Sequence, residues 1–483
     1  MNVEDVLYPL LPLQERVPEN VRAGIGRVYR RLPQRLRLGA GYDAFRALAA
    51  AAEFWSEEEM VDYQVTQLRA VLRHAAAHSP FYASRFADAG FDPRRFDGPD
   101  DLAGCPFTGK EDLVAHREDM ATDRPGRSRR LFVTSGGSTG APVGFYLHRG
   151  VSRPKEQAFL EAQWRRAGYF DGARLAVVRG QVTSARAAGR ISAYDPIGDR
   201  LILSSSHLTE ERLPEYLDEI VRFGPEILHI YPSAALLLAA LLARAGRTFP
   251  IPLRCVLAAS ERLDDVQRRR LEEVFECRVY SWYGHAERVV LAGQGRRSHL
   301  FYFWPAYGFV ELGPPDAQGL QEVIGTSFHN LAMPLIRYRT GDLVRAHDPR
   351  RDGPKELPWP AVRSIEGRGQ ELLVTATGRR ISLTAVNMHD STFEGLYAVQ
   401  FFQETAGRVE LRYVAGSDVA GRRHVQIESA LRRKLGDDLE VELRRVDDIE
   451  RTGRGKGKWL VSSLADASPP SLPAADPGGL GIA

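Results

Sequence analysis

The sequence predicts an α/β protein with a large layered N-terminal domain, whose sheets are flanked by helices, and a small α+β C-terminal domain. The chain has 483 residues, more than one hydrophobic core ordinarily serves, so two or three domains are expected. Between about residues 130 and 345, short apolar strands alternate with amphipathic helices, which favours a largely parallel sheet. From about residue 361 the pattern changes to a hairpin, two strands, a helix and a further strand, which indicates a separate unit.

The individual elements follow from hydrophobic spacing. Residues 56–90 show helical periodicity, and Ser79-Pro80 breaks it because proline disfavours a helical residue before it. The ten-residue apolar run Ala234–Ala243 is too short for the ~20 residues that span a bilayer, so it predicts a core helix. The strands expected in the large domain are 174–180, 226–231, 253–260 and 277–284, with a helix over 264–276.

Charge and composition limit the classes of partner. The formal net charge is +3, from 65 Lys and Arg against 62 Asp and Glu, so no single-sign field indicates a nucleic acid or a membrane. The basic stretches Arg27–Leu38 and Gln267–Glu273 are interpreted as solvated helix faces, with a docking surface as the alternative.

The cysteines and the N-terminus indicate the compartment. Cys105, Cys255 and Cys277 lie far apart and form no CxxC pair, which fits thiols in a reducing compartment and supports neither zinc nor a disulfide framework. The first residues include Glu4 and Asp5 instead of the basic start of a signal peptide. A cytoplasmic location is therefore expected.

The stretch Val133–Phe145, VTSGGSTGAPVGF, places four glycines among small hydroxyl residues. It lacks the GK[ST] ending of a Walker A loop and the GxGxxG spacing of a dinucleotide fingerprint. One interpretation remains functional, a loop that holds a triphosphate through backbone N–H groups and hydroxyls. The other is a simple connector, and the loop alone does not decide between them.

Three further stretches carry candidate chemistry. In WYGHAERV, an aromatic ring could stack on a base and Glu287 could reach Mg²⁺, unless this is a strand end packed on the core. In PLIRYRTGDLV, a β-like segment ends at Thr340-Gly341-Asp342, and Asp342 could accept hydrogen bonds from ribose hydroxyls or simply form an Asx turn. In ERTGRGKGKWL, Lys456 and Lys458 stand in a glycine-flanked loop, which could also be an exposed basic loop.

In this order and at these separations, the stretches resemble the adenylate-forming superfamily of acyl-CoA synthetases, nonribosomal adenylation domains and luciferases. The narrower resemblance is to its phenylacetate–coenzyme A ligase-like branch. It also rests on four other stretches, LRAVLRHAAAHSPFYASRF, CPFTGKEDL, ILHIYPSAALLLAALL and VLAASERL. The likeness covers about residues 60–462.

The resemblance implies a division of the chain and an activity. The expected parts are an N-terminal helical extension (1–60), an ATP- and acid-binding domain (61–367), a small mobile lid domain (368–463) and a disordered tail (464–483). The implied activity joins a carboxylic acid to AMP with release of pyrophosphate and then transfers the acyl group to coenzyme A. The alternatives are transfer to an amine, a carrier protein or another nucleophile, and a nucleotide-binding relative without catalysis.

The implied cofactors are ATP (as AMP in the intermediate), Mg²⁺ and coenzyme A, and the partners are a small carboxylic acid and an acyl acceptor, with neither nucleic acid nor membrane. A monomer or a homodimer is expected. By resemblance, Glu287 ligates Mg²⁺, Lys456 bridges the carboxylate and the α-phosphate, and Gln370 marks the hinge. The residues implied to contact the nucleotide are Thr134, Ser135, Gly136, Gly137, Ser138, Thr139, Gly140, Ser260, Glu261, Trp282, Tyr283, Gly284, His285, Asp342 and Arg368.

The chain departs from the family pattern at two places. Ala286 stands where a hydroxyl residue usually precedes the motif glutamate, so His285 could supply the missing hydrogen bond or be a packed structural histidine. The C-terminal loop has Arg454 where a serine is common, and Lys458 offers an alternative cation to Lys456. Aromatic and small apolar residues would suit an aryl or arylalkyl acid, and the pocket residues expected are Tyr231, Ser233, Ala258, Trp282 and His285.

Overall fold

The structure is a computed structural model. It describes residues 19–32, 34–39, 41–134, 143–179, 190–196, 198–259, 261, 263–316, 318–368, 372–376, 380–382, 396–415, 421–435, 439–450 and 458–464.

Helices make up the N-terminal part of the described chain: α3 (Glu19–Arg31), α4 (Gln34–Leu38), α5 (Gly41–Ala52), α6 (Glu57–His78), α7 (Pro80–Asp88), α8 (Lys110–Met120) and α9 (Ser152–Arg166). α6 begins with a capping box in which Ser56 and Glu59 satisfy each other's backbone N–H groups. Ser79 ends α6 and caps α7 ahead of Pro80. The predicted break at Ser79-Pro80 is confirmed.

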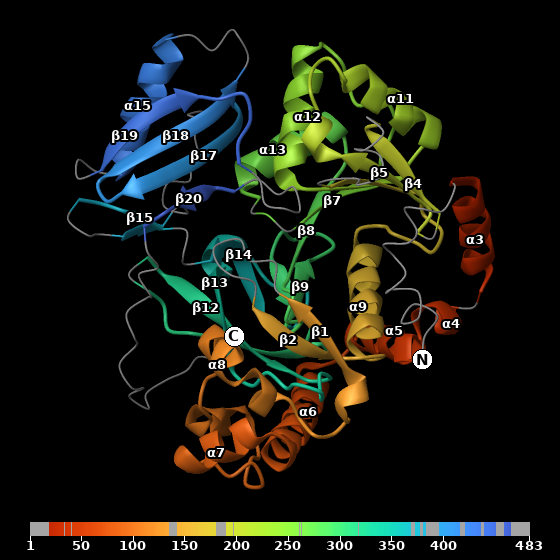
Figure 1. The fold of residues 1–483 in the computed structure, drawn as a ribbon, viewed down its shortest axis with the longest axis vertical. Coiled ribbons are helices and arrows are strands. Elements are labelled where there is room, and N and C mark those ends of the chain that lie inside the picture. Colours follow the sequence, from red (N-terminus) through yellow and green to blue (C-terminus); the bar gives the residue numbers. More distant parts are fainter. Residues whose placement is uncertain are drawn as a thin grey trace.

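A 12-stranded sheet forms the centre of the described residues (Figure 1). Its order is β11-β12-β13-β14-β10-β9-β8-β7-β6-β3-β5-β4. The strands are β3 (Leu175–Arg179), β4 (Ser192–Asp195), β5 (Arg200–Ser204), β6 (Ile227–Ile230), β7 (Cys255–Ala259), β8 (Val279–Gly284), β9 (Leu291–Gln294), β10 (Phe301–Phe303), β11 (Gly308–Leu312), β12 (Leu320–Ser327), β13 (Tyr338–Ala346) and β14 (Ala361–Arg368).

Only four of the eleven strand pairs in this sheet are parallel. These are β3–β5, β3–β6, β6–β7 and β7–β8, whereas β4–β5 and every pair from β8 to β11 are antiparallel. The expectation of a largely parallel sheet is therefore wrong beyond β8 and at the edge strand β4. The physical reason is connection length: parallel neighbours need a long crossover such as a helix, and the short loops after β8 join antiparallel neighbours.

Helices cover both faces of the parallel part of the sheet. One core packs α11 (Leu213–Phe223), α12 (Pro232–Arg244) and α13 (Asp265–Phe275) against side chains of the strands, including Ala258. On the opposite face, Trp164 of α9 packs with Val177, Ile227 and Leu257. The predicted core helix, the predicted helix over 264–276 and the α/β class are confirmed.

A separate hairpin carries the glycine-rich stretch. β1 (Arg130–Thr134) pairs antiparallel with β2 (Gly144–His148), and Thr134 is opposite Gly144. The residues between these two strands therefore connect them at one end of the hairpin. A Cβ at Gly144 would come within 2.6 Å of the exposed Phe132 ring, so a side chain there would have to displace that ring.

The C-terminal part contains the expected hairpin, β15 (Leu372–Val374) and β16 (Arg380–Ser382). A four-stranded sheet follows in the order β19-β18-β17-β20, with a core that includes Phe401, Leu411 and Leu431. Its elements are β17 (Leu396–Thr405), β18 (Arg408–Ala415), α15 (Gly421–Leu435), β19 (Glu440–Arg445) and β20 (Leu460–Ser462). The α+β texture is as predicted, and β17 contacts α12 of the large part (Figure 1).

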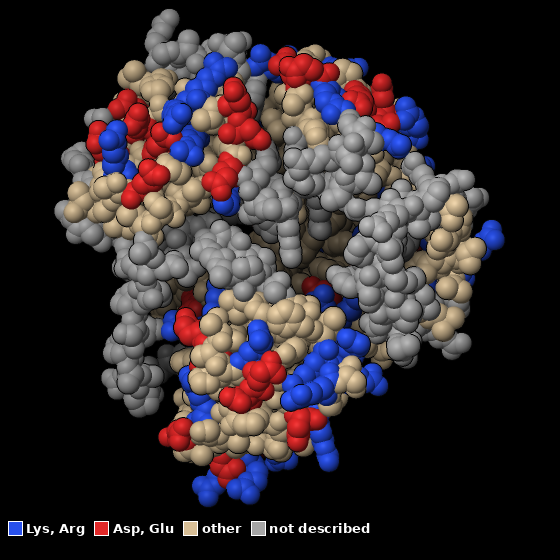
Figure 2. All heavy atoms as spheres, viewed as in Figure 1, with Lys and Arg blue, Asp and Glu red and all other residues tan. Residues whose placement is uncertain are grey.

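Acidic and basic side chains alternate over the visible surface of the C-terminal sheet and of α11–α13 (Figure 2). Among the described residues, no helix is long and apolar enough to span a membrane.

Candidate active site

The end of β8 and the turn after it carry the motif Tyr283–Glu287. Tyr283 points into the core, where its ring lies 6.2 Å from that of Phe303. The chain then turns, with the Arg288 N–H donating to the His285 carbonyl at 3.0 Å. Arg288 has φ +54°, a backbone conformation that residues other than glycine rarely adopt. Gly284 is exposed at the end of the strand.

Tyr283 and Asp342 meet although 59 residues separate them. The Tyr283 hydroxyl donates to Asp342 Oδ2 at 2.8 Å. Burial, and then the charge of Asp342, raises the pKa of Tyr283 well above its usual value, so the phenol stays a neutral donor. A carboxyl group whose one oxygen accepts from the Tyr283 hydroxyl can also accept hydrogen bonds from sugar hydroxyls.

The sequence predicted that Asp342 ends a strand, but in the structure it lies within one. β13 continues through it to Ala346, and residues 340–342 bulge opposite Val323. Gly341 has φ +73°, which permits the bulge, and the Asp342 N–H donates to the Thr340 hydroxyl at 3.0 Å. The bulge re-aims the carboxylate toward Tyr283.

Glu287 is a buried carboxylate, only 3% exposed. The Tyr338 hydroxyl donates to Oε1 at 3.2 Å, and His285 Nδ1 lies 3.2 Å from Oε2. Because a carboxylate only accepts, this contact assigns the proton to Nδ1 in the neutral ring. His285 Nε2 is buried and has no hydrogen-bond partner among the described residues. Tyr338 was not predicted, although it stands in the same motif as Asp342.

The residues present fit Mg²⁺. A buried carboxylate is a suitable hard oxygen ligand, and Mg²⁺ is ordinarily held by one or two carboxylates together with substrate phosphates and water. The described residues contain no cluster of three or more His, Cys, Asp or Glu that could hold a metal by itself.

Side chains of α9 contact the turn that carries Glu287. Glu156 Oε2 lies 3.9 Å from Arg288 Nε and also accepts a hydrogen bond from the Tyr307 hydroxyl. The neighbouring Lys155 is 3% exposed; its Nζ donates to the Tyr307 carbonyl at 2.6 Å and lies 3.6 Å from the Tyr307 ring centroid. Burial lowers the pKa of Lys155 to about 7. Neither Lys155 nor Glu156 was predicted, because their only sequence signal is position in an ordinary helix.

The residues expected to line the acid pocket fall on two faces of the sheet. Tyr231 and Ala258 belong to the core under α11–α13, and Ser233 is in the first turn of α12. Trp282 is the cross-strand partner of Ala259 in β7, and it packs on the other face of the sheet. The structure therefore does not bring these residues into one wall.

Trp282 instead forms an aromatic cluster with two residues that sequence reasoning missed. Its ring centroid is 5.7 Å from that of Trp164 and 5.1 Å from that of His229, and these two are 5.5 Å apart. The three residues come from α9, β6 and β8. Only the tertiary fold brings them together.

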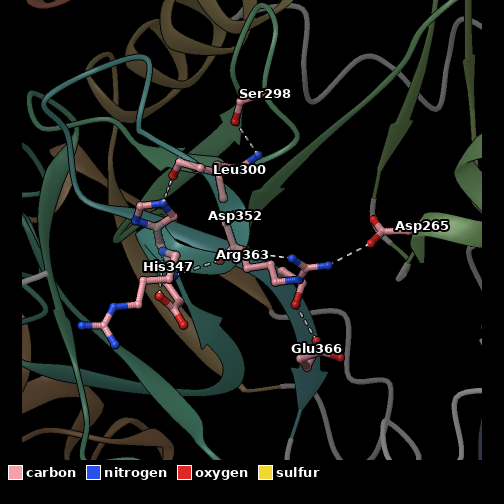
Figure 3. A network of polar contacts seen from close by, with 11 residues as sticks. Asp265, Ser298, Leu300, His347, Asp352, Arg363 and Glu366 are labelled. Atoms are coloured by element: carbon pink, nitrogen blue, oxygen red, sulfur yellow. Dashed lines mark hydrogen bonds and ion pairs between the residues drawn. The ribbon is translucent and has the colours of Figure 1, made fainter.

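Arg363, near the start of β14, links this strand to two other elements. Its Nη2 lies 3.2 Å from Asp265 at the start of α13, and its Nη1 contacts Asp352 in α14 (Pro349–Asp352) (Figure 3). β14 ends at Arg368, whose backbone pairs with Asp342. The predicted site residue Arg368 is thus adjacent to the predicted ribose ligand.

The remaining predicted residues are only partly visible. The backbone of Thr134 ends β1, and Glu261 is half-buried just after β7. Lys458, the alternative cation, forms an ion pair with Glu450. The predicted residues outside the described ranges are Ser135, Gly136, Gly137, Ser138, Thr139, Gly140, Ser260, Gln370 and Lys456, and the expected tail lies outside them after Leu464.

The chain is similar in sequence and fold to several known proteins. A family model described as the CapK C-terminal domain matches residues 373–463. A phenylacetate-coenzyme A ligase of Pseudomonas putida is 28% identical over 345 residues, 69% of this chain and 76% of that protein. Protein CapK of Staphylococcus aureus is 21% identical over 373 residues, 74% of this chain and 80% of that protein.

A solved structure of 2-hydroxyisobutyryl-CoA ligase, in the postadenylation state, has a TM-score of 0.65 at 18% sequence identity. It covers 86% of this chain and 92% of the other chain, and at this identity the likeness concerns the fold. Through its matched relatives and the motifs on β8 and β13, the chain is similar to the phenylacetate–coenzyme A ligase-like branch of the adenylate-forming superfamily, and it shares the fold of a solved CoA ligase.

Proposed function

We propose that this protein activates a carboxylic acid with ATP, forming an acyl-adenylate and pyrophosphate, and then transfers the acyl group to coenzyme A. The observation that carries the proposal is the convergence of Tyr283, Glu287 and Asp342, from two distant motifs, with a buried ordered carboxylate in each. These groups could bind the adenine ring, a metal-bound phosphate and the ribose.

In the first step an oxygen of the substrate carboxylate attacks the α-phosphorus, and the bond to the pyrophosphate oxygen breaks. Asp342 anchors the ribose, Tyr283 contacts the adenine, and backbone N–H groups of the glycine-rich loop, residues 134–140, bind the outer phosphates. Mg²⁺, when held by Glu287, neutralises charge on the phosphate oxygens. In the second step the thiol sulfur attacks the acyl carbonyl carbon, its proton is lost, and AMP leaves.

We assign the transition-state cation to Lys456. Negative charge grows on the bridging and leaving oxygens, so a fixed cation stabilises the transition state more than the ground state. The ion pair of Lys458 with Glu450 supports this choice, because it occupies the alternative ammonium within the C-terminal unit. In this proposal residues 368–463 form a lid that rotates about Gln370.

We assign the hydrogen bond lost at Ala286 to His285. Its Nδ1 is engaged by Glu287, whereas its buried Nε2 has no partner among the described residues, as expected of a group that awaits a ligand. We also propose an aryl or arylalkyl acid as substrate; the aromatic cluster of Trp164, His229 and Trp282, one residue from Tyr283, supports it.

The test is pyrophosphate release with ATP, Mg²⁺ and a panel of aryl, arylalkyl and short aliphatic acids, with and without coenzyme A. We expect acid-dependent release, and thioester only with coenzyme A. Lys456→Ala should lower the rate about 10²–10³-fold, whereas the matched Lys458→Ala should lower it much less. Release without thioester would assign another acceptor, and absence of release with every acid would contradict the proposal.

A further inference from the structure

α3 exposes a continuous aliphatic stripe. Val21, Ile25 and Val28 are spaced i, i+4 and i+7, so they share one face of the helix. Their exposed fractions are 47%, 54% and 65%. Leu36 of α4, shortly after, is also exposed. Side chains of this kind at this spacing ordinarily face a core, and here they face outward.

The other face of α3 is anchored, which fixes the direction of the stripe. Arg30 Nη1 donates to the Tyr194 hydroxyl at 3.1 Å and lies 3.5 Å from Asp199. At Gly26 a Cβ would clash with Pro196, so the helix backbone lies directly on that residue. α3 lies at the edge of the molecule, and α4 follows it (Figure 1).

The same segment concentrates positive charge. Residues 20–42 contain six arginines and no Asp or Glu. The whole chain carries a formal net charge of +3, so all other residues together carry net −3. Arg31 is exposed at the end of α3, beside the stripe. The segment is therefore apolar on one helix face and cationic as a whole.

We propose that α3 and α4 bind the surface of an anionic lipid bilayer, with Val21, Ile25 and Val28 inserted among the headgroups and exposed Arg31 on lipid phosphates. An exposed apolar helix face beside basic residues is the pattern of interfacial helices, and anionic lipids supply the complementary charge. A second copy of the chain fits less well, because a two-fold interface would bring this cationic segment against itself. This association is peripheral, it revises the expectation of no membrane partner, and it is independent of the proposed catalysis.

The experiment is co-sedimentation of the full chain with vesicles of phosphatidylcholine containing about 30% phosphatidylglycerol, compared with pure phosphatidylcholine. We expect the protein to pellet with the anionic vesicles only, and less at high salt. The double variant Ile25→Gln and Val28→Gln should bind about tenfold more weakly. Val221→Gln is the matched control, since Val221 is 53% exposed on α11. Arg31→Glu should also weaken binding, and Arg95→Glu at a distant exposed site should not.

Four results would overturn the proposal. They are no pelleting of the wild type, equal binding by the stripe variants, a dimer in light scattering that the stripe variants abolish, and binding only after removal of residues 1–18. The third would assign the stripe to a second copy, and the fourth would assign it to the chain's own N-terminus. Because the exchanged side chains are exposed, thermal unfolding of the variants should match the wild type and serves as the folding control.

Discussion

Lys155→Met is predicted to stabilise the protein at neutral pH. Lys155 is an almost fully buried amine whose neighbours include the Tyr307 carbonyl and ring, and its pKa falls from 10.5 to about 7. Between these values the unfolded chain binds the proton more tightly than the folded one. Proton uptake therefore favours unfolding of the wild type. The resulting loss in the free energy of unfolding becomes smaller as pH rises.

The magnitude follows from the two pKa values. A group with pKa about 7 folded and 10.5 unfolded costs the folded state about 4 kcal/mol at pH 7 and about 1 kcal/mol at pH 9.5. Methionine removes this cost but leaves the Tyr307 carbonyl without its donor, which costs about 1–3 kcal/mol. The net gain is then about 2 kcal/mol at pH 7, and it disappears near pH 9.5.

The assay is urea unfolding of wild type and variant at both pH values, followed by tryptophan fluorescence. Lys355→Met is the control, because exposed Lys355 also donates to a backbone carbonyl, that of Trp359. A variant less stable than wild type at pH 7, or a stability difference that does not change with pH, would refute the reasoning.

Three further outcomes are expected. Glu156→Gln should raise the Mg²⁺ concentration for half-maximal pyrophosphate release several-fold with kcat unchanged, and Glu156→Asp should restore part of it, because the charge on Arg288 positions Glu287. Trp282→Ala should shift kcat/KM toward bulkier acids by about tenfold, measured on the acid panel. Burial lowers the pKa of His329 well below 6.5, so stability should fall as pH drops below 6.5, and His329→Gln should reduce that loss in thermal melts between pH 7.5 and pH 5.5.

Local patterns predicted the elements well. The helix break at Ser79-Pro80 and the helix over 264–276 follow from proline geometry and from hydrophobic spacing, which act within a few residues. Strand direction does not depend on such local signals. Segments after β8 have the same apolar texture as the parallel strands, and only their short connections reverse them.

The candidate site was predicted through resemblance, residue by residue. Tyr283, Glu287 and Asp342 stand in motifs that are contiguous in sequence, and the structure adds that two of them touch. Their supports could not be found in this way. Glu156 and Trp164 contact residues more than 100 positions away in the sequence. Nothing in the helical stretch around them distinguishes a residue that supports the site from a surface residue.

The most direct test of the central claim measures binding of a non-hydrolysable ATP analogue, with Mg²⁺, to wild type and Asp342→Asn by calorimetry. Loss of a hydrogen bond to a charged group predicts affinity about 10- to 150-fold weaker, whereas Asp97→Asn, at a surface ion pair far along the chain, should bind like wild type. Equal affinity of Asp342→Asn and wild type would contradict the placement of the ribose at Asp342 and with it the nucleotide site.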